Sequence, residues 1–218
     1  MYEIDHIFLL TDINAPVADQ FVEAGLTEGL SRIHPGQGTT NRRFFFSNIM
    51  FEFLWVHDIV EVGSPAIADT HLLERWQGRA GSACPFGICF RPGHQAASQA
   101  FTLFPSWDYK PPYLPDNLAI QVADNASNLA EPFLFYLSWA QAPAAEQSPV
   151  NHHAKVERLT QLELTTVNVQ SPTHALSAAS AYFALTSGDI YEMSLIFDEG
   201  RQNKVLDLRP IAPLVLMY

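Results

Sequence analysis

The 218-residue chain is poor in cysteine and has no long apolar run, which excludes several classes of protein. Its two cysteines, Cys84 and Cys89, lack CxxC spacing and flank an apolar segment, so they predict buried free thiols in a reducing cytoplasm. No run approaches the roughly 20 apolar residues of a membrane span. The N-terminal stretch MYEIDHIFLL begins with acidic residues, whereas a secretory signal begins with basic ones. We therefore expect a soluble, cytoplasmic protein.

Positive charge is also scarce, with 12 Lys and Arg against 23 Asp and Glu, a net charge of −11 and a pI of about 5.0. Such an acidic chain is a poor partner for nucleic acid or for an anionic membrane, because phosphate contacts dominate both interactions. The adjacent pair Arg42 and Arg43 is a local basic spot that suits a small anion. The motifs G-x-S-x-G and G-x-G-x-x-G are absent, and HPGQG at 34–38 is typical of a turn because it lacks Walker spacing.

With 48% hydrophobic residues the chain can bury a sizeable core, and its apolar segments follow a repeating order. An apolar run at 4–10 is followed by an N-cap at Asn14 and a helical stripe that ends at Gly25. Two strand-like runs, 41–46 and 49–56, then form a predicted hairpin. The first unit is therefore a strand, a helix and two or three strands.

The same order starts twice more along the chain. The second unit has a strand at 86–90, a helix-compatible stretch at 92–101 and strands at 118–122 and 133–137. The third has a strand at 159–167, a helix capped by Ser171 and Pro172, and three closing strands. The predicted divisions are a first βαβββ module at 1–62, a helical connector at 63–82, a second, degenerate module at 83–139, a linker at 140–157 and a third βαβββ-like unit at 158–218.

Glu52 is the unusual residue of the apolar stretch SNIMFEFLWV. Side chains on a strand alternate between faces, so Phe51, Phe53 and Trp55 form a core face and Glu52 points to the other side. The same alternation in the first strand puts Ile4, His6 and Phe8 on one face, and Asp5, Ile7 and Leu9 on the other. A buried carboxylate is costly without a partner, so Glu52 should face a cation, a metal or a wet cavity. His6 is a natural partner if the first and last strands of the unit are neighbours.

IDHIFLL, HPGQGTTNRRFFFSNIMFEFLWV and PFGICFRP resemble the vicinal oxygen chelate superfamily, and within it the glyoxalase-like domain group. The resemblance covers residues 1 to about 139, with a weaker third unit. It implies an α+β fold in which repeated βαβββ modules form curved, mostly antiparallel, cup-like sheets, with metal ligands on the first and last strands. Members of the superfamily include isomerases, lyases, ring-cleaving dioxygenases, epimerases and antibiotic-resistance proteins.

Carried over residue by residue, the resemblance implies that His6 and Glu52 are metal ligands. The second unit departs from the pattern, because Gly87 and Leu134 fall where its ligands should be. In the third unit, Gln161 aligns with His6 and is an acceptable ligand. Leu214 or Val215, however, falls where the second glutamate would be.

The implied cation is a divalent metal such as zinc, nickel, iron or manganese. Because a catalytic ion usually needs three protein ligands, a further ligand is required, and the candidates are His34, Gln161, His152 and His153.

Two functional hypotheses follow. In the first, the cup of the first module binds a small organic molecule that is anionic or carries a carbonyl group. Glu52 then serves as metal ligand or general base in isomerase or lyase chemistry. Arg42 or Arg43 would anchor the anionic end, with Asn41 and His34 as further contacts. In the second, the protein is a non-catalytic binding or sequestering module with a degenerate metal site. A role through dimerisation also stays open, so a homodimer is compatible with both.

Overall fold

The computed structural model describes residues 2–93, 103–141, 150–167 and 170–218. The first unit begins with a long strand and a short helix and continues with three strands. Their bounds are β1 (Tyr2–Leu10), α1 (Ala18–Glu23), β2 (Ile33–His34), β3 (Thr39–Phe45) and β4 (Met50–Val56). Three short helices follow, α2 (Ile59–Val62), α3 (Pro65–Ala68) and α4 (Leu72–Gly78).

The second unit contains β5 (Phe86–Pro92), β6 (Ser106–Tyr109), β7 (Ile120–Ala123) and β8 (Phe133–Tyr136). The helix expected at 92–101 lies almost wholly outside the described residues, as does the 142–149 part of the expected linker. The third unit contains β9 (Leu159–Val167), α5 (His174–Ala179), β10 (Ala184–Gly188), β11 (Glu192–Phe197), a 3₁₀ turn (Asp198–Gly200), β12 (Val205–Asp207) and β13 (Leu214–Met217). In the described part of the chain, no helix has both the length and the apolar character to cross a membrane.

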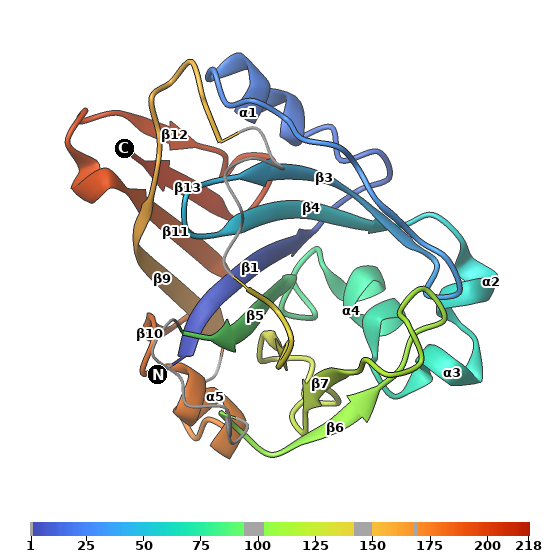
Figure 1. The fold of residues 1–218 in the computed structure, drawn as a ribbon. Coiled ribbons are helices and arrows are strands. Elements are labelled where there is room, and N and C mark those ends of the chain that lie inside the picture. Colours follow the sequence, from blue (N-terminus) through green and yellow to red (C-terminus); the bar gives the residue numbers. More distant parts are fainter. Residues whose placement is uncertain (1, 94–102, 142–149, 168–169) are drawn as a thin grey trace.

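The first two units share one curled eight-stranded sheet with the order β2-β3-β4-β1-β5-β8-β7-β6 (Figure 1). In each unit the first strand runs parallel to the last, β1 beside β4 and β5 beside β8. The two units join through the antiparallel pair β1 and β5. The expected α+β architecture with a curled, mostly antiparallel sheet is therefore confirmed, and both units have the same internal strand order.

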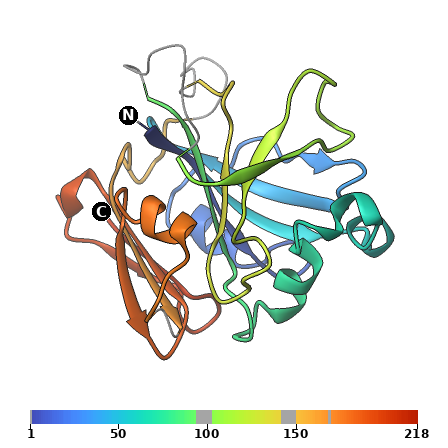
Figure 2. The same ribbon diagram turned by 90° about the horizontal axis from the view of Figure 1, so that it is seen from below.

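The third unit forms a separate five-stranded sheet with a different order, β10-β9-β11-β13-β12. Here the first strand, β9, pairs with β10 and β11, whereas β13 lies beyond β11. The two sheets share one hydrophobic core, in which Phe46 and Phe197 have ring centroids 4.4 Å apart. Figure 2 shows the second sheet, orange to red, on one side of the first sheet, and α2 to α4 at the other end of the molecule.

Strand alternation holds along β4 and fails at one point of β1. Phe51, Phe53 and Trp55 lie in the large core, as expected, while Glu52 faces the concave side. In β1 the pairing with β5 shifts between Ile4 and His6, so Asp5 is an extra, bulged residue. Ile4 therefore packs against the large core instead of sharing the face of His6, which corrects the expected alternation.

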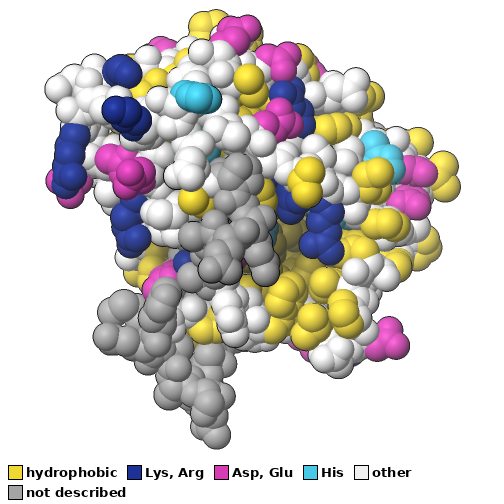
Figure 3. All heavy atoms as spheres, turned by 45° about the horizontal axis from the view of Figure 1, so that its top comes forward, with side chains coloured by type: hydrophobic (Ala, Val, Ile, Leu, Met, Phe, Trp, Pro, Cys, Tyr) yellow, Lys and Arg dark blue, Asp and Glu magenta, His cyan; other side chains and the backbone are white. Residues whose placement is uncertain are grey.

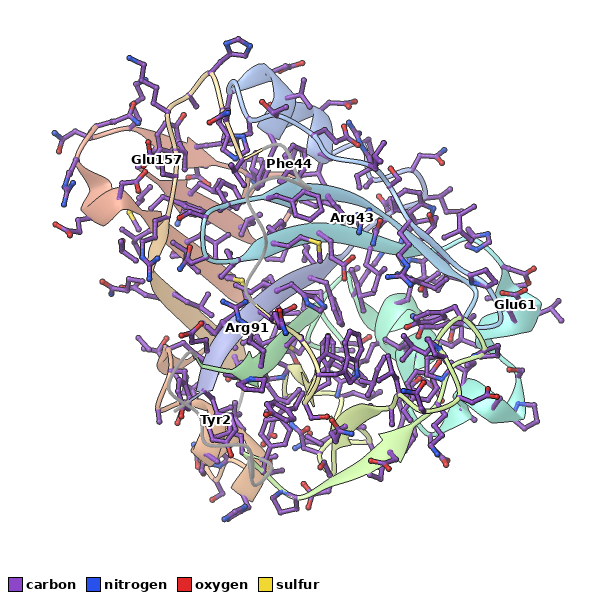
Figure 4. The ribbon with its side chains drawn as sticks, viewed as in Figure 1. Tyr2, Arg43, Phe44, Glu61, Arg91 and Glu157 are labelled. Carbon is purple, nitrogen blue, oxygen red and sulfur yellow. The ribbon has the colours of Figure 1, made fainter. Side chains whose placement is uncertain are left out.

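The turn at 34–38 is held against helix α2. Glu61 of α2, labelled in Figure 4, accepts hydrogen bonds from the backbone N–H groups of Gly36 and Gly38, at 2.7 and 3.1 Å. Gly38 has φ +75°, and its carbonyl accepts from the backbone N–H groups of His57 and Asp58. A Cβ at Gly38 would lie 2.4 Å from the Asp58 carbonyl oxygen, so only glycine fits this turn.

We expect Gly38→Ala to destabilise the protein by about 3 kcal/mol, because it combines a left-handed backbone with a backbone clash. Gly200 is the matched control, since it has φ +68° but open space around its Cβ position. Gly200→Ala should lower the free energy of unfolding by only roughly 1 kcal/mol, because the alanine would adopt a left-handed backbone conformation without a clash. Urea unfolding of both variants measures the difference, and equal losses would contradict the packing of this turn.

Candidate functional site

The concave side of the first sheet encloses a cavity of ≈130 Å³ between the two units. At about 10–15 Å³ per water, it has space for roughly ten water-sized atoms. Figure 3 shows dark-blue Lys and Arg side chains beside a hollow lined with yellow hydrophobic side chains. The lining residues are His6, Phe8, Arg32, His34, Gln37, Asn41, Arg43, Met50, Glu52, Leu54, Leu72, Tyr109, Tyr113, Ile120, Phe133, Phe135 and Leu137.

His6 and Glu52 face this cavity from neighbouring parallel strands, β1 and β4. The Nε2 atom of His6 lies 4.0 Å from Glu52 Oε1, and its Nδ1 atom lies 2.7 Å from Asp5 Oδ2. Burial by itself lowers the pKa of His6, but the hydrogen bond and charge of Asp5, together with Glu52, outweigh it and raise that pKa. The sequence-predicted pair is therefore brought together, and Asp5 fixes the ring so that Nε2 points inward.

The bulge at Asp5 also joins His6 to a buried arginine. Arg91 of β5 is 2% exposed, and its Nη1 donates to Asp5 Oδ1 at 3.1 Å. Its Nη2 donates to Glu3 at 3.0 Å and to the Asn48 carbonyl oxygen at 3.2 Å. Burial opposes ionisation of Asp5, yet the hydrogen bonds and charges of His6 and Arg91 lower its pKa. Asp5 is thus a charged carboxylate held between His6 and Arg91.

Glu52 is 5% exposed and is hydrogen-bonded by one neighbour, Asn41. The Asn41 amide nitrogen donates to Glu52 Oε2, and the Asn41 Oδ1 atom accepts from the backbone N–H of Arg32 at 2.8 Å. Burial raises the pKa of Glu52, and the opposing effects of His6, Asn41 and Arg43 do not cancel it. This carboxyl group therefore binds a proton more readily than an exposed glutamate does.

Arg42 and Arg43 leave opposite faces of β3. Arg42 lies on the face away from the cavity, where it pairs with Glu28 at 2.6 Å and with Asp19 at 2.8 Å. Arg43, labelled in Figure 4, lines the cavity, donates from Nε to the Leu30 carbonyl oxygen at 2.6 Å, and forms no ion pair with a carboxylate of the described residues. Of the two arginines predicted to bind the ligand, Arg43 lies at the cavity, whereas Arg42 forms ion pairs on the other face of β3.

A second unpaired guanidinium, Arg32, joins Arg43 at the cavity. It lies 5.4 Å from the centroid of the Tyr113 ring and has no ion pair within the part of the chain that the structure describes. His34 also lines the cavity, but burial and then the charges of Arg32 and Arg43 lower its pKa to about 3. His34 is therefore neutral at physiological pH, and the positive charge of this wall comes from the two arginines.

Gln37, from the HPGQG turn, organises the tyrosines of the opposite wall. Its Oε1 atom accepts from the hydroxyls of Tyr109, at 3.0 Å, and Tyr113, at 3.2 Å. Its Nε2 atom donates to Thr39 Oγ1, which also contacts His34 Nδ1 at 2.9 Å. The turn thus connects the two units across the cavity.

The second unit lines its part of the cavity with aromatic rings where the resemblance implies metal ligands. Gly87 lies under the Phe8 ring, and a Cβ there would come within 2.1 Å of it. In β8 it is Phe133 and Phe135 that face the cavity, whereas Leu134 lies in the large core. This register differs by one residue from the sequence alignment, which put Leu134 at the ligand position. None of these side chains can bind a metal.

The other proposed metal ligands lie elsewhere. Gln161 of β9 is exposed, does not line this cavity, and donates a hydrogen bond to Glu163 at 2.6 Å. His153 is also exposed. His152 is buried rather than solvated, with its Nδ1 accepting from the Thr27 backbone N–H at 2.9 Å and its Nε2 lying 3.0 Å from the Phe45 carbonyl oxygen. Both of its nitrogens are therefore used in the packing of the chain.

The side chains of Asp5, His6 and Cys89 offer ligand atoms within 4.8 Å of one another, a set able to hold a metal ion. Cys89 pairs with His6 across β1 and β5 and is buried, which raises the pKa of its thiol well above the usual value. Cys84 is likewise buried, and both cysteines are free, as the sequence predicts. Asp5 and Arg32 are the site residues that sequence reasoning missed, since no motif marks either one.

Comparison with known proteins identifies the fold and leaves the activity open. No protein-family description matches the sequence, and no curated protein does. The crystal structure of a hypothetical protein from Staphylococcus aureus is similar over 99% of both chains, with a TM-score of 0.57 and 11% identity. A hypothetical protein from Bacillus halodurans C-125 matches over 66% of this chain and 98% of its own, with a TM-score of 0.41 and 11% identity. The first likeness shows that the fold of the whole chain recurs.

We expect Glu52→Gln to be more stable than the wild type at pH 7.5. The folded-state pKa of Glu52 is raised, so its proton-linked stabilisation is present at low pH and is lost as the pH rises through that pKa. The advantage of the variant should therefore shrink as the pH falls toward 4. Urea unfolding across this range measures it, with Glu23→Gln on the exposed side of α1 as control. A variant less stable than the wild type at pH 7.5 would contradict the costly burial of this carboxylate.

Proposed function

We propose that the chain is a glyoxalase-like protein of the vicinal oxygen chelate type whose cup binds and transforms a small organic molecule. The observation that carries the proposal is the buried Glu52 carboxylate, which faces the cavity 4.0 Å from His6 and lies near unpaired guanidinium groups. Structural glutamates are rarely buried beside a cavity without a full set of partners. The identical strand order of the two units supports the family assignment.

Glu52 serves as the general base in this proposal. Its carboxylate removes a proton from a carbon next to the carbonyl group of the ligand, so a C–H bond breaks, an O–H bond forms, and the electron pair moves onto the carbonyl oxygen as an enolate. The raised pKa of Glu52 makes it a stronger base than an exposed carboxylate. Return of the proton to the same carbon restores Glu52 and the ligand. Where that carbon carries a hydroxyl group, its O–H proton can move to the enolate oxygen; return of the first proton to the former carbonyl carbon then completes an isomerisation and restores Glu52.

His6 stabilises the enolate oxygen, while Arg43 anchors the anionic end of the ligand. The raised pKa of His6 favours its protonated form, in which Nδ1–H donates to Asp5 and Nε2–H points into the cavity. Two titratable groups with adjacent but different environments are a common arrangement of an acid and a base. Asp5 acts through His6 by holding its ring in place.

A divalent cation held by His6 and Glu52 is the second candidate, in which the same pair are metal ligands. Two tetrahedral ligands that each lie about 2.0–2.2 Å from one ion are about 3.4 Å apart, so the 4.0 Å separation of these two atoms would have to shorten on metal binding. Asp5 is placed as the carboxylate that orients a ligating histidine. Gly87 and Leu134 of the second unit add no ligand, and Cys89 of the same unit forms a candidate ligand group with Asp5 and His6, a group that does not include Glu52. Such an ion would supply Lewis-acid stabilisation of the enolate.

Deuterium exchange tests the base. Levulinate and 3-benzoylpropionate both carry a CH₂ group beside a ketone, together with a carboxylate. We expect the wild-type protein in D₂O to speed deuterium uptake at that carbon of at least one of them, followed by NMR. Glu52→Gln should bind the same compound without the acceleration. Equal rates for wild type and variant, or no acceleration of either compound, would contradict Glu52 as the base.

Elemental analysis separates the metal candidate from the metal-free one. The protein should be purified without an affinity tag or chelator, and Glu52→Ala should be prepared in the same way. A near-stoichiometric divalent metal that is lost in Glu52→Ala would support the metal site. Less than about a tenth of an equivalent, unchanged by the substitution, would exclude a tightly bound metal.

A non-catalytic binding module is the alternative function, favoured by the aromatic filling of the second half of the site. It predicts that a ligand stabilises the protein against unfolding while deuterium exchange stays at the uncatalysed rate. The oligomeric state, including a homodimer, stays a prediction.

A further inference from the structure

The cavity has two chemically distinct walls, a cationic one from the first unit and an aromatic one in which Phe8 of the first unit joins side chains of the second. The first unit supplies Arg32 and Arg43, neither of which forms an ion pair with an acidic side chain among the described residues, although the charge of Glu52 acts on Arg43. The protein as a whole has a net charge of −11, and Arg42, Arg79, Arg91, Arg201 and Arg209 are each paired with an acidic side chain. Arg75 and Arg158 have no ion pair among the described residues either, but Arg75 donates to three backbone carbonyl oxygens and neither lines this cavity. Two arginines without such a partner at one cavity therefore indicate an anionic ligand.

The Arg43 guanidinium is fixed in a way that leaves its outer edge open. Its Nε donates to the Leu30 carbonyl oxygen, and its Cζ atom lies 5.3 Å from the Phe45 ring centroid. No hydrogen bond from Nη1 or Nη2 is made to any described residue. The two Nη groups are thus available for a carboxylate, which guanidinium groups bind with paired hydrogen bonds.

The opposite wall is aromatic and apolar. Phe8, Phe133 and Phe135 form a continuous cluster, with ring centroids 5.4 to 6.1 Å apart. The edge of Phe135 also packs on the His6 ring, at 5.2 Å between centroids. The aromatic cluster therefore meets the polar pair, and a ligand that bridges both walls has a flat apolar part next to its charged end.

From these two walls we infer that the ligand of the cup is a small aromatic carboxylate, with its carboxylate at Arg43 and Arg32 and its ring against Phe8, Phe133 and Phe135. Space for roughly ten water-sized atoms matches a single ring with a short acidic side chain. Glu52 and His6 then lie beside the atoms that link the ring to the carboxylate. This inference deepens the proposed function and rests on it for the location of the site.

Four probes separate the contributions of charge and ring. Phenylacetate has both, 2-phenylacetamide has the same shape without the charge, acetate lacks the ring, and cyclohexylacetate replaces the aromatic ring by a saturated one. Calorimetric titration of the full chain should show phenylacetate binding at least about tenfold more tightly than 2-phenylacetamide or acetate. Cyclohexylacetate should bind about threefold more weakly than phenylacetate, since it loses the aromatic contacts.

Substitutions assign each preference to its wall. Arg43→Gln should weaken the binding of phenylacetate about tenfold and change the affinity for 2-phenylacetamide by no more than about twofold. Arg32→Gln should change the two affinities in the same direction. The matched control is Arg201→Gln, which makes the same charge change at an exposed arginine paired with Glu199. It should leave the affinities for both compounds unchanged. Phe135→Leu should remove the preference for phenylacetate over cyclohexylacetate. Circular dichroism and unfolding curves confirm that each variant is folded.

Several results would overturn the inference. These are no binding of phenylacetate at millimolar concentration, equal binding of phenylacetate and 2-phenylacetamide, or equal effects of Arg43→Gln and Arg201→Gln. The binding assay in Glu52→Gln separates this inference from the proposed function, because the ligand contacts do not need the base. If the protein selects phenylacetate but does not accelerate deuterium exchange, the inference stands and the catalytic proposal fails. If it accelerates exchange of levulinate but shows no preference for the aromatic carboxylate, the catalytic proposal stands and the inference fails.

Discussion

Burial of the Glu52 carboxylate is the constraint on which the concave face of this protein depends. A carboxylate with 5% exposure needs partners, and the chain provides Asn41 by hydrogen bond, His6 at 4.0 Å, and the nearby charge of Arg43. Each partner is itself held in place, His6 by Asp5 and Asp5 by Arg91. The result is a row of ionisable side chains in which Arg91, Asp5 and His6 are hydrogen-bonded in turn and lead to Glu52 at the cavity. Such a row limits how β1, β4 and β5 can shift relative to one another.

The two units have the same strand order and have diverged in the side chains that they present. The first unit contributes the carboxylate, the histidine and the cations, and the second contributes phenylalanines and tyrosines. Gly87 makes this division possible, because the missing side chain leaves room for the Phe8 ring in the second half of the cavity. A site that began from symmetric modules would in this way become a polar wall facing an apolar one, which suits an asymmetric ligand.

Much of this architecture follows from the sequence, and the exceptions have specific physical causes. Alternation along β4 correctly separates Glu52 from Phe51, Phe53 and Trp55, because a regular strand has a strict period of two. The period fails at Asp5, where a bulge inserts one residue that no local signal announces.

Long-range packing accounts for the other departures. The choice between Arg42 and Arg43 depends on Glu28 and Asp19, and the burial of His152 depends on contacts with Thr27 and Phe45. The third unit resembles the others in its order along the chain, yet β9 pairs with β10 and β11, which a linear pattern does not specify.

A crystal structure of the full chain with phenylacetate tests the two-walled cavity most directly. We expect the carboxylate within hydrogen-bonding distance of the Arg43 guanidinium, the ring against Phe133 and Phe135, and the methylene carbon facing Glu52. Phenylacetate bound outside the cup, or bound with its ring toward the arginines and its carboxylate toward the phenylalanines, would contradict the account.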